Sequence, residues 1–175
     1  NDAAYLSLAY DAIVGNDLPR VIELEQELHA SKTARETREA SLKLGMRLLK
    51  IFSRYPEHRR SELAQRYQDS LAAQNALGMY PVVFALYAVI GGIPKADTLY
   101  AFYYNSVSAM VTNGVKLIPL SQMDGQDIVV KLRNDMNDWV AQSLDPDRDW
   151  LGASTVASDI HAMQHERLYT RLYMS

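Results

Sequence analysis

A long stretch without charge, Thr98 to Val115, constrains the fold of this chain more than any other feature. Apolar side chains recur in it on every face of a helix, and a helix of this kind normally lies in the middle of a protein. Polar residues such as Asn105 and Thr112 interrupt it, so it is not the run of about twenty apolar residues that a membrane span needs. We therefore predict a buried central helix at about 97–115, with Met110 among its buried side chains.

The segments on either side of this stretch also have the patterns of helices. Pro119 must end or kink the central helix, and apolar residues at helical spacing indicate an exit helix at 122–144. Before the central helix, amphipathic and apolar segments alternate with Gly and Pro. No period-2 strand pattern of useful length occurs. The sequence predicts an all-α fold, a single domain of about seven to nine helices over residues 1–175.

Composition narrows the possible functions. The chain is 48% hydrophobic and 22% charged, which is typical of a globular domain. It has no cysteine, which excludes a disulfide framework, a thiolate metal site and a cysteine nucleophile. The net charge of −3 argues against a general nucleic-acid binder.

Positive charge is concentrated in residues 32–66, which hold ten Lys and Arg against four acidic residues. Residues 1–31 hold one Arg against six acidic residues, and the remainder holds seven basic against eleven acidic residues. The basic block is interpreted first as a solvated helical face. A stripe that docks an acidic protein partner is a second interpretation, and a nucleic-acid patch is a third.

Two histidines one helical turn apart are the main candidates for chemistry. His161 and His165 have the spacing of a two-imidazole metal pair, with Glu166 adjacent. A structural or interface role is the alternative. There is no G-x-S-x-G elbow and no phosphate-binding loop, and the aspartates around Pro146 are interpreted as a solvated turn. We assign no catalytic and no cofactor-binding residue, and name His161 and His165 only as candidate metal ligands.

The C-terminal segment 159–175 has the composition of a docking element. Tyr169 and Tyr173 lie close to Arg167 and Arg171, and Tyr and Arg are favoured at interface hot spots. A chain end usually lacks fixed structure unless it is docked. The segment either packs on its own domain or binds a partner.

Three stretches together resemble the UreF family of urease accessory proteins. Residues 35–45 are like its "E-x-R-x-x-S-x-x-x-G" helix, and residues 115–126 are like its "V-R-L-x-P-L-G-Q-x-x-G-Q" corner. Residues 159–175 are like its terminal "M-x-H-E-x-x-Y-S-R-L-F-x-S". Lys116, Ser121, Thr170 and Tyr173 are mild departures, and His161 is not part of the family pattern. The similarity covers essentially the whole chain. The N-terminal portion of the family is apparently missing.

The resemblance implies an all-α, homodimeric, non-enzymatic scaffold of the cytoplasm. Family members bind the accessory protein called UreD or UreH, recruit the nickel-carrying GTPase UreG and present the assembly to apo-urease. GTP-dependent nickel insertion follows, with gating of the GTPase as a further implied role. Nickel is handled by the complex, and no cofactor is expected to be bound stably. Neither nucleic acid nor membrane is an expected partner. The alternative is a small helical metal-binding protein or metalloenzyme that uses His161 and His165.

The resemblance also assigns residues. The partner-binding residues of the C-terminal docking tail, 159–175, are His165, Glu166, Tyr169, Arg171 and Leu172, with Arg171 as the first choice. The other motif residues have uncertain roles: Glu36, Arg38, Ser41, Gly45, Lys116, Pro119, Gln122 and Gln126.

Overall fold

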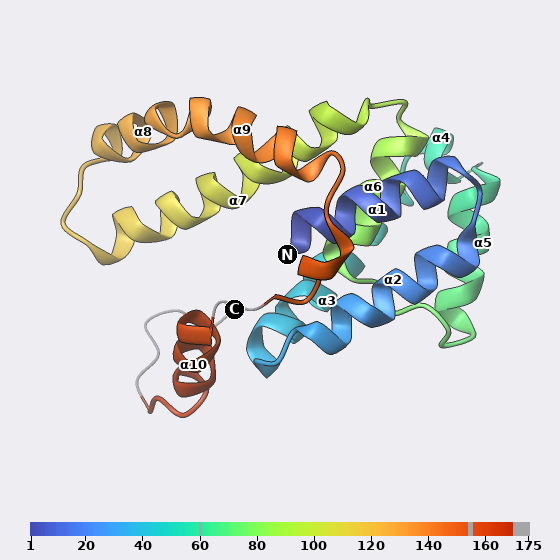
Figure 1. The fold of residues 1–175 in the computed structure, drawn as a ribbon, viewed down its shortest axis with the longest axis horizontal. Coiled ribbons are helices and arrows are strands. Elements are labelled where there is room, and N and C mark those ends of the chain that lie inside the picture. The colour runs from blue at the N-terminus through green and yellow to red at the C-terminus, as the bar shows by residue number, and fades with distance from the viewer. Residues whose placement is uncertain (60, 154–155, 170–175) are drawn as a thin grey trace.

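The computed structural model describes residues 1–59, 61–153 and 156–169, and every regular element in these ranges is helical. A compact body contains α1 (Asp2–Val14), α2 (Leu18–Ser31), α3 (Arg35–Phe52), α4 (Pro56–Arg59), α5 (Glu62–Ala72) and α6 (Tyr80–Ile90). An arm extends from it and contains α7 (Lys95–Leu117), α8 (Gln122–Lys131) and α9 (Arg133–Ser143). The 3₁₀-helix η1 (Arg148–Trp150) and α10 (Val156–His165) follow (Figure 1). The predicted all-α single domain is confirmed.

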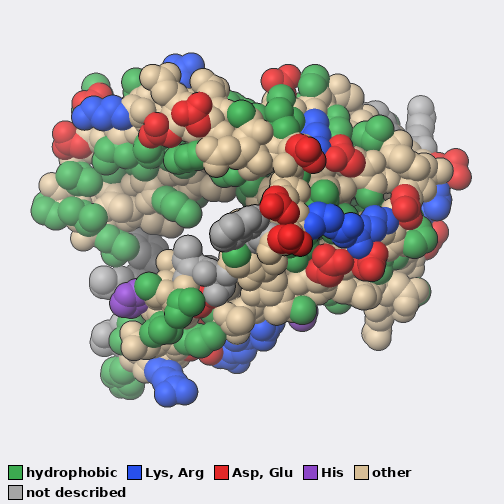
Figure 2. Space-filling view, viewed as in Figure 1, with side chains coloured by type: hydrophobic (Ala, Val, Ile, Leu, Met, Phe, Trp, Pro, Cys, Tyr) green, Lys and Arg blue, Asp and Glu red, His purple; other side chains and the backbone are tan. Residues whose placement is uncertain are grey.

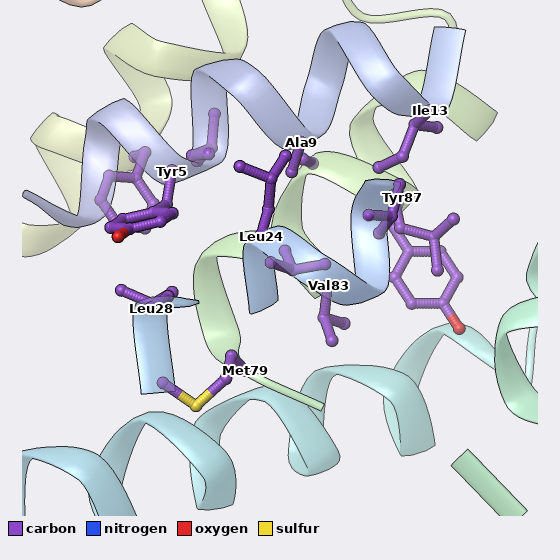
Figure 3. Close-up of a cluster of buried hydrophobic side chains, with 14 of the residues drawn as sticks. Tyr5, Ala9, Ile13, Leu24, Leu28, Met79, Val83 and Tyr87 are labelled. Carbon is purple, nitrogen blue, oxygen red and sulfur yellow. The ribbon is translucent and has the colours of Figure 1, made fainter. Parts of the chain in front are cut away.

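The helix at the centre of the body is α6. A helix does span the predicted range 97–115, as part of α7, but its predicted buried and central position is wrong. Apolar residues cover nearly all of α6, seven of its residues are buried, and it packs against α1 on one side and α3 on another. Figure 3 shows side chains of α1 and α2, such as Ala9 and Leu24, converging on Val83 and Tyr87 of α6. A helix that is apolar all round needs partners on several sides, and α6 has them.

The uncharged stretch forms most of α7, which is buried only along part of its length. Leu99 and Phe102 are buried against the body, whereas Met110 is 72% exposed. Beyond the body α7 packs on α8 and α9, where Val107, Val129 and Met136 form a second, smaller core. The outer surface of the arm carries many hydrophobic side chains (Figure 2).

Two devices close the tip of the arm. The α8 N-terminus has a capping box, in which Ser121 accepts from the Asp124 N–H and Asp124 accepts from the Ser121 N–H. Gly125 lets the two helices approach, because a Cβ there would lie 2.8 Å from a methyl carbon of Val115. The predicted exit helix at 122–144 is in two pieces, since α8 ends at Lys131 and α9 begins at Arg133.

Hydrogen bonds fasten the base of the arm to the body. The Lys95 ammonium donates to the Asp11 carboxylate at 2.6 Å and to the backbone oxygen of Leu144, just beyond α9, at 2.7 Å. The Ser7 hydroxyl donates to the same oxygen at 3.3 Å.

Among the described residues, no helix is long and apolar enough to cross a membrane.

A buried carboxylate holds the start of α6. Glu25 of α2 is 0% exposed and accepts hydrogen bonds from the backbone N–H groups of Leu77, Gly78 and Met79 at 2.7–3.0 Å. It also accepts from the Tyr67 hydroxyl at 2.7 Å. Burial, together with the adjacent Glu25 carboxylate, raises the pKa of Tyr67 well above its usual value, so this hydroxyl keeps its proton and donates. A negative group at a helix N-terminus is also favoured by the helix dipole.

Two motif residues of α3 contact the segment that leads into α6. The Ser41 hydroxyl accepts from the Tyr80 N–H at 3.3 Å. Gly45 faces the carbonyl of Gly78, and a Cβ at Gly45 would lie 2.0 Å from that oxygen. Ser41 and Gly45 therefore seat α3 against the segment that leads into α6, which explains why this motif needs a small side chain at each position.

We predict that Gly45→Ala destabilises the fold by about 1–3 kcal/mol or more, because the new methyl group overlaps backbone atoms that cannot rotate away. Gly114→Ala in α7 is the matched control, since nothing lies within 4 Å of its added Cβ. Ala is the better helix former by about 1 kcal/mol, so the control should be neutral or stabilised. Urea denaturation of both variants measures the difference. Equal stabilities would contradict the close approach.

We predict that Glu25→Gln lowers the free energy of unfolding by about 1–3 kcal/mol, because an amide NH₂ replaces an acceptor among buried N–H donors. Glu23→Gln is the control on the same helix, and its exposed side chain should change stability by less than about 0.5 kcal/mol. Thermal melts followed by circular dichroism compare the two. A Glu25→Gln melt that coincides with that of the unmodified chain would refute this role.

Candidate functional site

The C-terminal helix α10 lies against the first turn of α3, and three polar contacts join them. The His165 Nδ1 is 2.7 Å from the Glu36 Oε2. The Arg35 Nε donates to the Glu166 Oε2 at 3.3 Å. The Glu36 backbone N–H donates to the other Glu166 oxygen, Oε1, at 3.3 Å. The first and third motifs, about 130 residues apart in sequence, therefore meet in space.

Glu166 compensates for a missing cap on α3. The N-cap residue of α3 is Ala34, whose side chain cannot accept a hydrogen bond. The first N–H groups of a helix have no partner within the helix. The Glu166 carboxylate supplies an acceptor there and adds negative charge at the positive end of the helix. The docking of α10 therefore supplies the hydrogen-bond acceptor that the N-cap residue of α3 lacks.

Arg38, the second residue of the same motif, fixes the corner that precedes α3. Its guanidinium donates to the backbone oxygen of Lys32 at 2.8 Å. The Lys32 ammonium in turn pairs with the Asp2 carboxylate at 2.8 Å. These contacts connect the ends of α1 and α2 to α3, and so set the position of the turn that receives α10.

The outer side of α10 is apolar and uncovered. Val156, Ile160 and Met163 lie at positions i, i+4 and i+7 and are all exposed, and no described residue of α10 is buried. Leu168 and Tyr169 continue this surface beyond the helix, and Tyr169 is fully exposed. Apolar side chains grouped in this way on a surface commonly mark an interaction site.

The structure places some of the predicted partner-binding residues together. His165 and Glu166 meet α3, and Tyr169 points into solvent. Arg171 and Leu172 lie outside the described residues. Of the candidate metal ligands, His161 is exposed one turn before His165, whose Nδ1 faces Glu36. In the described ranges, no group of three or more His, Cys, Asp or Glu side chains could hold a metal ion.

The corner motif lies at the tip of the arm, at the turn between α7 and α8 (Figure 1). Its four residues of uncertain role are all exposed: Lys116, Pro119, Gln122 and Gln126. Leu117 and Ile118 beside them are more than half exposed. The corner between α7 and α8 therefore presents apolar side chains to solvent.

Sequence reasoning missed both Glu25 and the contact between Glu36 and His165. Glu25 left a signal, because it stands in the row of buried apolar positions Val21, Leu24 and Leu28 on α2, where a carboxylate needs buried donors. The Glu36–His165 contact left no signal in spacing, because it joins residues that only the tertiary fold brings together.

Comparison with known proteins gives a consistent result. A family model described as UreF matches residues 1–133. A "Urease accessory protein UreF" from Actinobacillus pleuropneumoniae serotype 5b is 58% identical over all 175 residues, which cover 76% of that protein. One of the same name from Haemophilus influenzae is also 58% identical over the whole chain, which covers 73% of it. A third, from Bacillus sp. (strain TB-90), is 34% identical over 169 residues, 96% of this chain and 73% of the relative.

We predict that Glu166→Ala loosens α10 and destabilises the body by only about 1 kcal/mol, through the lost cap of α3. The substitution removes the acceptor for the Arg35 guanidinium and for the Glu36 N–H, and partly exposed polar contacts of this kind contribute about 1 kcal/mol or less each. Hydrogen exchange measured by mass spectrometry should show faster exchange in α10. Arg167→Ala, an exposed neighbour, is the control and should leave α10 exchange unchanged. Equal exchange in the two variants would contradict the assignment.

Proposed function

The chain belongs to the UreF family of urease accessory proteins, and on this premise we propose that it is a non-enzymatic scaffold in urease maturation. In this proposal it joins UreD/UreH to the GTPase UreG and presents the assembly to apo-urease. The assembly then inserts nickel in a GTP-dependent step, which the scaffold gates. Nickel is handled by the complex, and the chain itself holds no cofactor stably.

The observation that carries this proposal is the way α10 is placed. Polar contacts with α3 hold its inner side, while Val156, Ile160 and Met163 stay uncovered on its outer side. Tyr169 follows and is fully exposed. A helix that is held in place while its apolar side stays exposed can bind a partner at low entropic cost. Binding then buries apolar area without first ordering the whole helix.

We assign the docking surface to the tail 159–175, as the UreF motif implies. His165 and Glu166 position it on α3, and Tyr169, Arg171 and Leu172 contact UreD/UreH and help to recruit UreG. Tyr and Arg are the residue types that most often dominate binding energy at such surfaces. The scaffold acts as a homodimer in the cytoplasm, and neither nucleic acid nor membrane is among its partners.

The alternative, a metal-binding protein or metalloenzyme using His161 and His165, has less support. The His165 Nδ1 already faces a carboxylate of α3. His161 is exposed and stands outside the family pattern. The contact with Glu36 is accounted for by the docking of α10, which needs no metal.

We predict that removal of residues 163–175 abolishes capture of UreD/UreH and UreG, because it removes the exposed end of α10 and the tail. The measurement is co-purification after co-expression with both partners.

Arg171→Ala in the whole chain should weaken capture by about 2–5 kcal/mol if its charge is buried and paired in the complex. Arg133→Ala, an exposed arginine of the arm, is the control. Capture by the truncated chain as efficient as by the whole chain would move the interface away from the tail.

A further inference from the structure

A line of cations runs along the outer side of α3. Lys43, Arg47 and Lys50 are exposed and lie at positions i, i+4 and i+7, and Arg54 continues the line in the turn that follows the helix. At 3.6 residues per turn these four positions fall within a narrow arc, and at 1.5 Å per residue they span about 16 Å. We refer to these four residues as the basic stripe.

The basic stripe is opposite the face through which α3 packs on α6. The buried residues of α3 are Ser41, Gly45 and Leu49, which lie about half a turn away from Lys43 and Arg47 around the helix. The stripe is therefore directed away from the core. Its charges have no part in holding α3 to the body.

Among the side chains that the structure describes, none neutralises the four cations. No side chain of the basic stripe makes a hydrogen bond or an ion pair with any of them, unlike Lys32, Arg35 and Arg38 earlier in the same segment. No acidic residue occurs between Glu39 and Glu57. Like charges one turn apart repel each other and destabilise an isolated helix slightly, so the stripe is a cost that the fold itself does not require.

Apolar side chains border the basic stripe. Leu44, Met46, Ile51 and Tyr55 are each about half exposed. A face used only for solvation has no need of four large apolar groups beside its charges. Arg47, Arg54, Met46 and Tyr55 are of residue types that are enriched at protein interfaces. At such surfaces charge supplies orientation and speed of association.

We propose that the basic stripe and its apolar border form a docking surface for an acidic amphipathic helix of a partner protein. Such a helix would carry carboxylates at i, i+4, i+7 and i+11, facing the four cations, with aliphatic residues beside them. A nucleic acid fits less well, because it has no use for the apolar border and the chain as a whole is negatively charged. The basic stripe lies on α3 and the exposed apolar side chains on α10, so the proposal goes beyond the scaffold function assigned to the tail.

A synthetic peptide tests the proposal without any urease protein, so its failure would not bear on the proposed function. The probe is a fluorescent helical peptide of about 18 residues with Glu at the four spacings above and Leu beside them. A peptide of the same composition in scrambled order is its control. Binding to the whole chain is measured by fluorescence anisotropy at about 0.05 M and about 0.3 M salt, since an interaction of exposed charges weakens as ionic strength rises.

The variant pair is matched in charge. Arg47→Glu/Lys50→Glu reverses the centre of the basic stripe, and Lys131→Glu/Arg133→Glu makes the same change with two exposed residues of the arm. We expect the first variant to weaken peptide binding by about tenfold or more, and the second by less than about twofold. Both should melt like the unmodified chain. If the reversed stripe fails to fold, Arg47→Gln/Lys50→Gln replaces it. We also expect Ile51→Ser to weaken binding, because it removes part of the apolar border.

Four results would overturn the proposal. The first is that the chain does not bind the probe, and the second is that it binds the scrambled peptide as well. The third is equal loss in the two charge-reversed variants. The fourth is that the basic stripe serves another occupant. Binding of a DNA duplex or a phosphatidylglycerol vesicle through Arg47 and Lys50, without binding of the peptide, would identify that occupant. A second copy of the chain would be the occupant if stripe reversal dissociates a dimer in sedimentation.

Discussion

The Glu25 carboxylate at the start of α6 is the interaction on which the rest of the structure depends. A charge that is completely buried is tolerated only when hydrogen bonds replace its lost water, and four donors around Glu25 do so. Three of them are backbone groups of the segment that leads into α6, so this one side chain of α2 fixes where α6 begins. Tyr67 brings α5 to the same point.

The position of α6 then determines where the functional surfaces lie. Gly45 and Ser41 hold α3 against the start of α6. The first turn of α3 is then free to contact α10, and the side of α3 that faces away from α6 carries the basic stripe. Helix α3 therefore has three roles: it packs against the core, it binds α10, and it exposes a charged surface. Its motif residues divide accordingly: Ser41 and Gly45 stabilise the core, and Glu36 holds α10.

Prediction from sequence succeeded where the signal is local and failed where it depends on partners. Helical periodicity and the positions of Pro and Gly were sufficient for the all-α class. The central helix was misplaced because an absence of charge is not the same as burial. Neutral polar residues such as Asn113 let the far half of α7 meet solvent, and Met110 is exposed on the arm. The shorter α6, which is more evenly apolar, holds the centre.

By itself the sequence determined the fold class, the family and the residues that its motifs share, because helix formation follows local patterns and the motifs are written in residue identity. It also showed that positive charge gathers in one block. Only the tertiary structure decided that Glu36 meets His165 and Glu166 and that Gly45 approaches Gly78. It also decided that the side chains of the basic stripe pair with no other side chain that the structure describes. The reason is physical: contacts between residues far apart in the chain depend on how helices pack, and many packings are compatible with the same pattern of apolar faces.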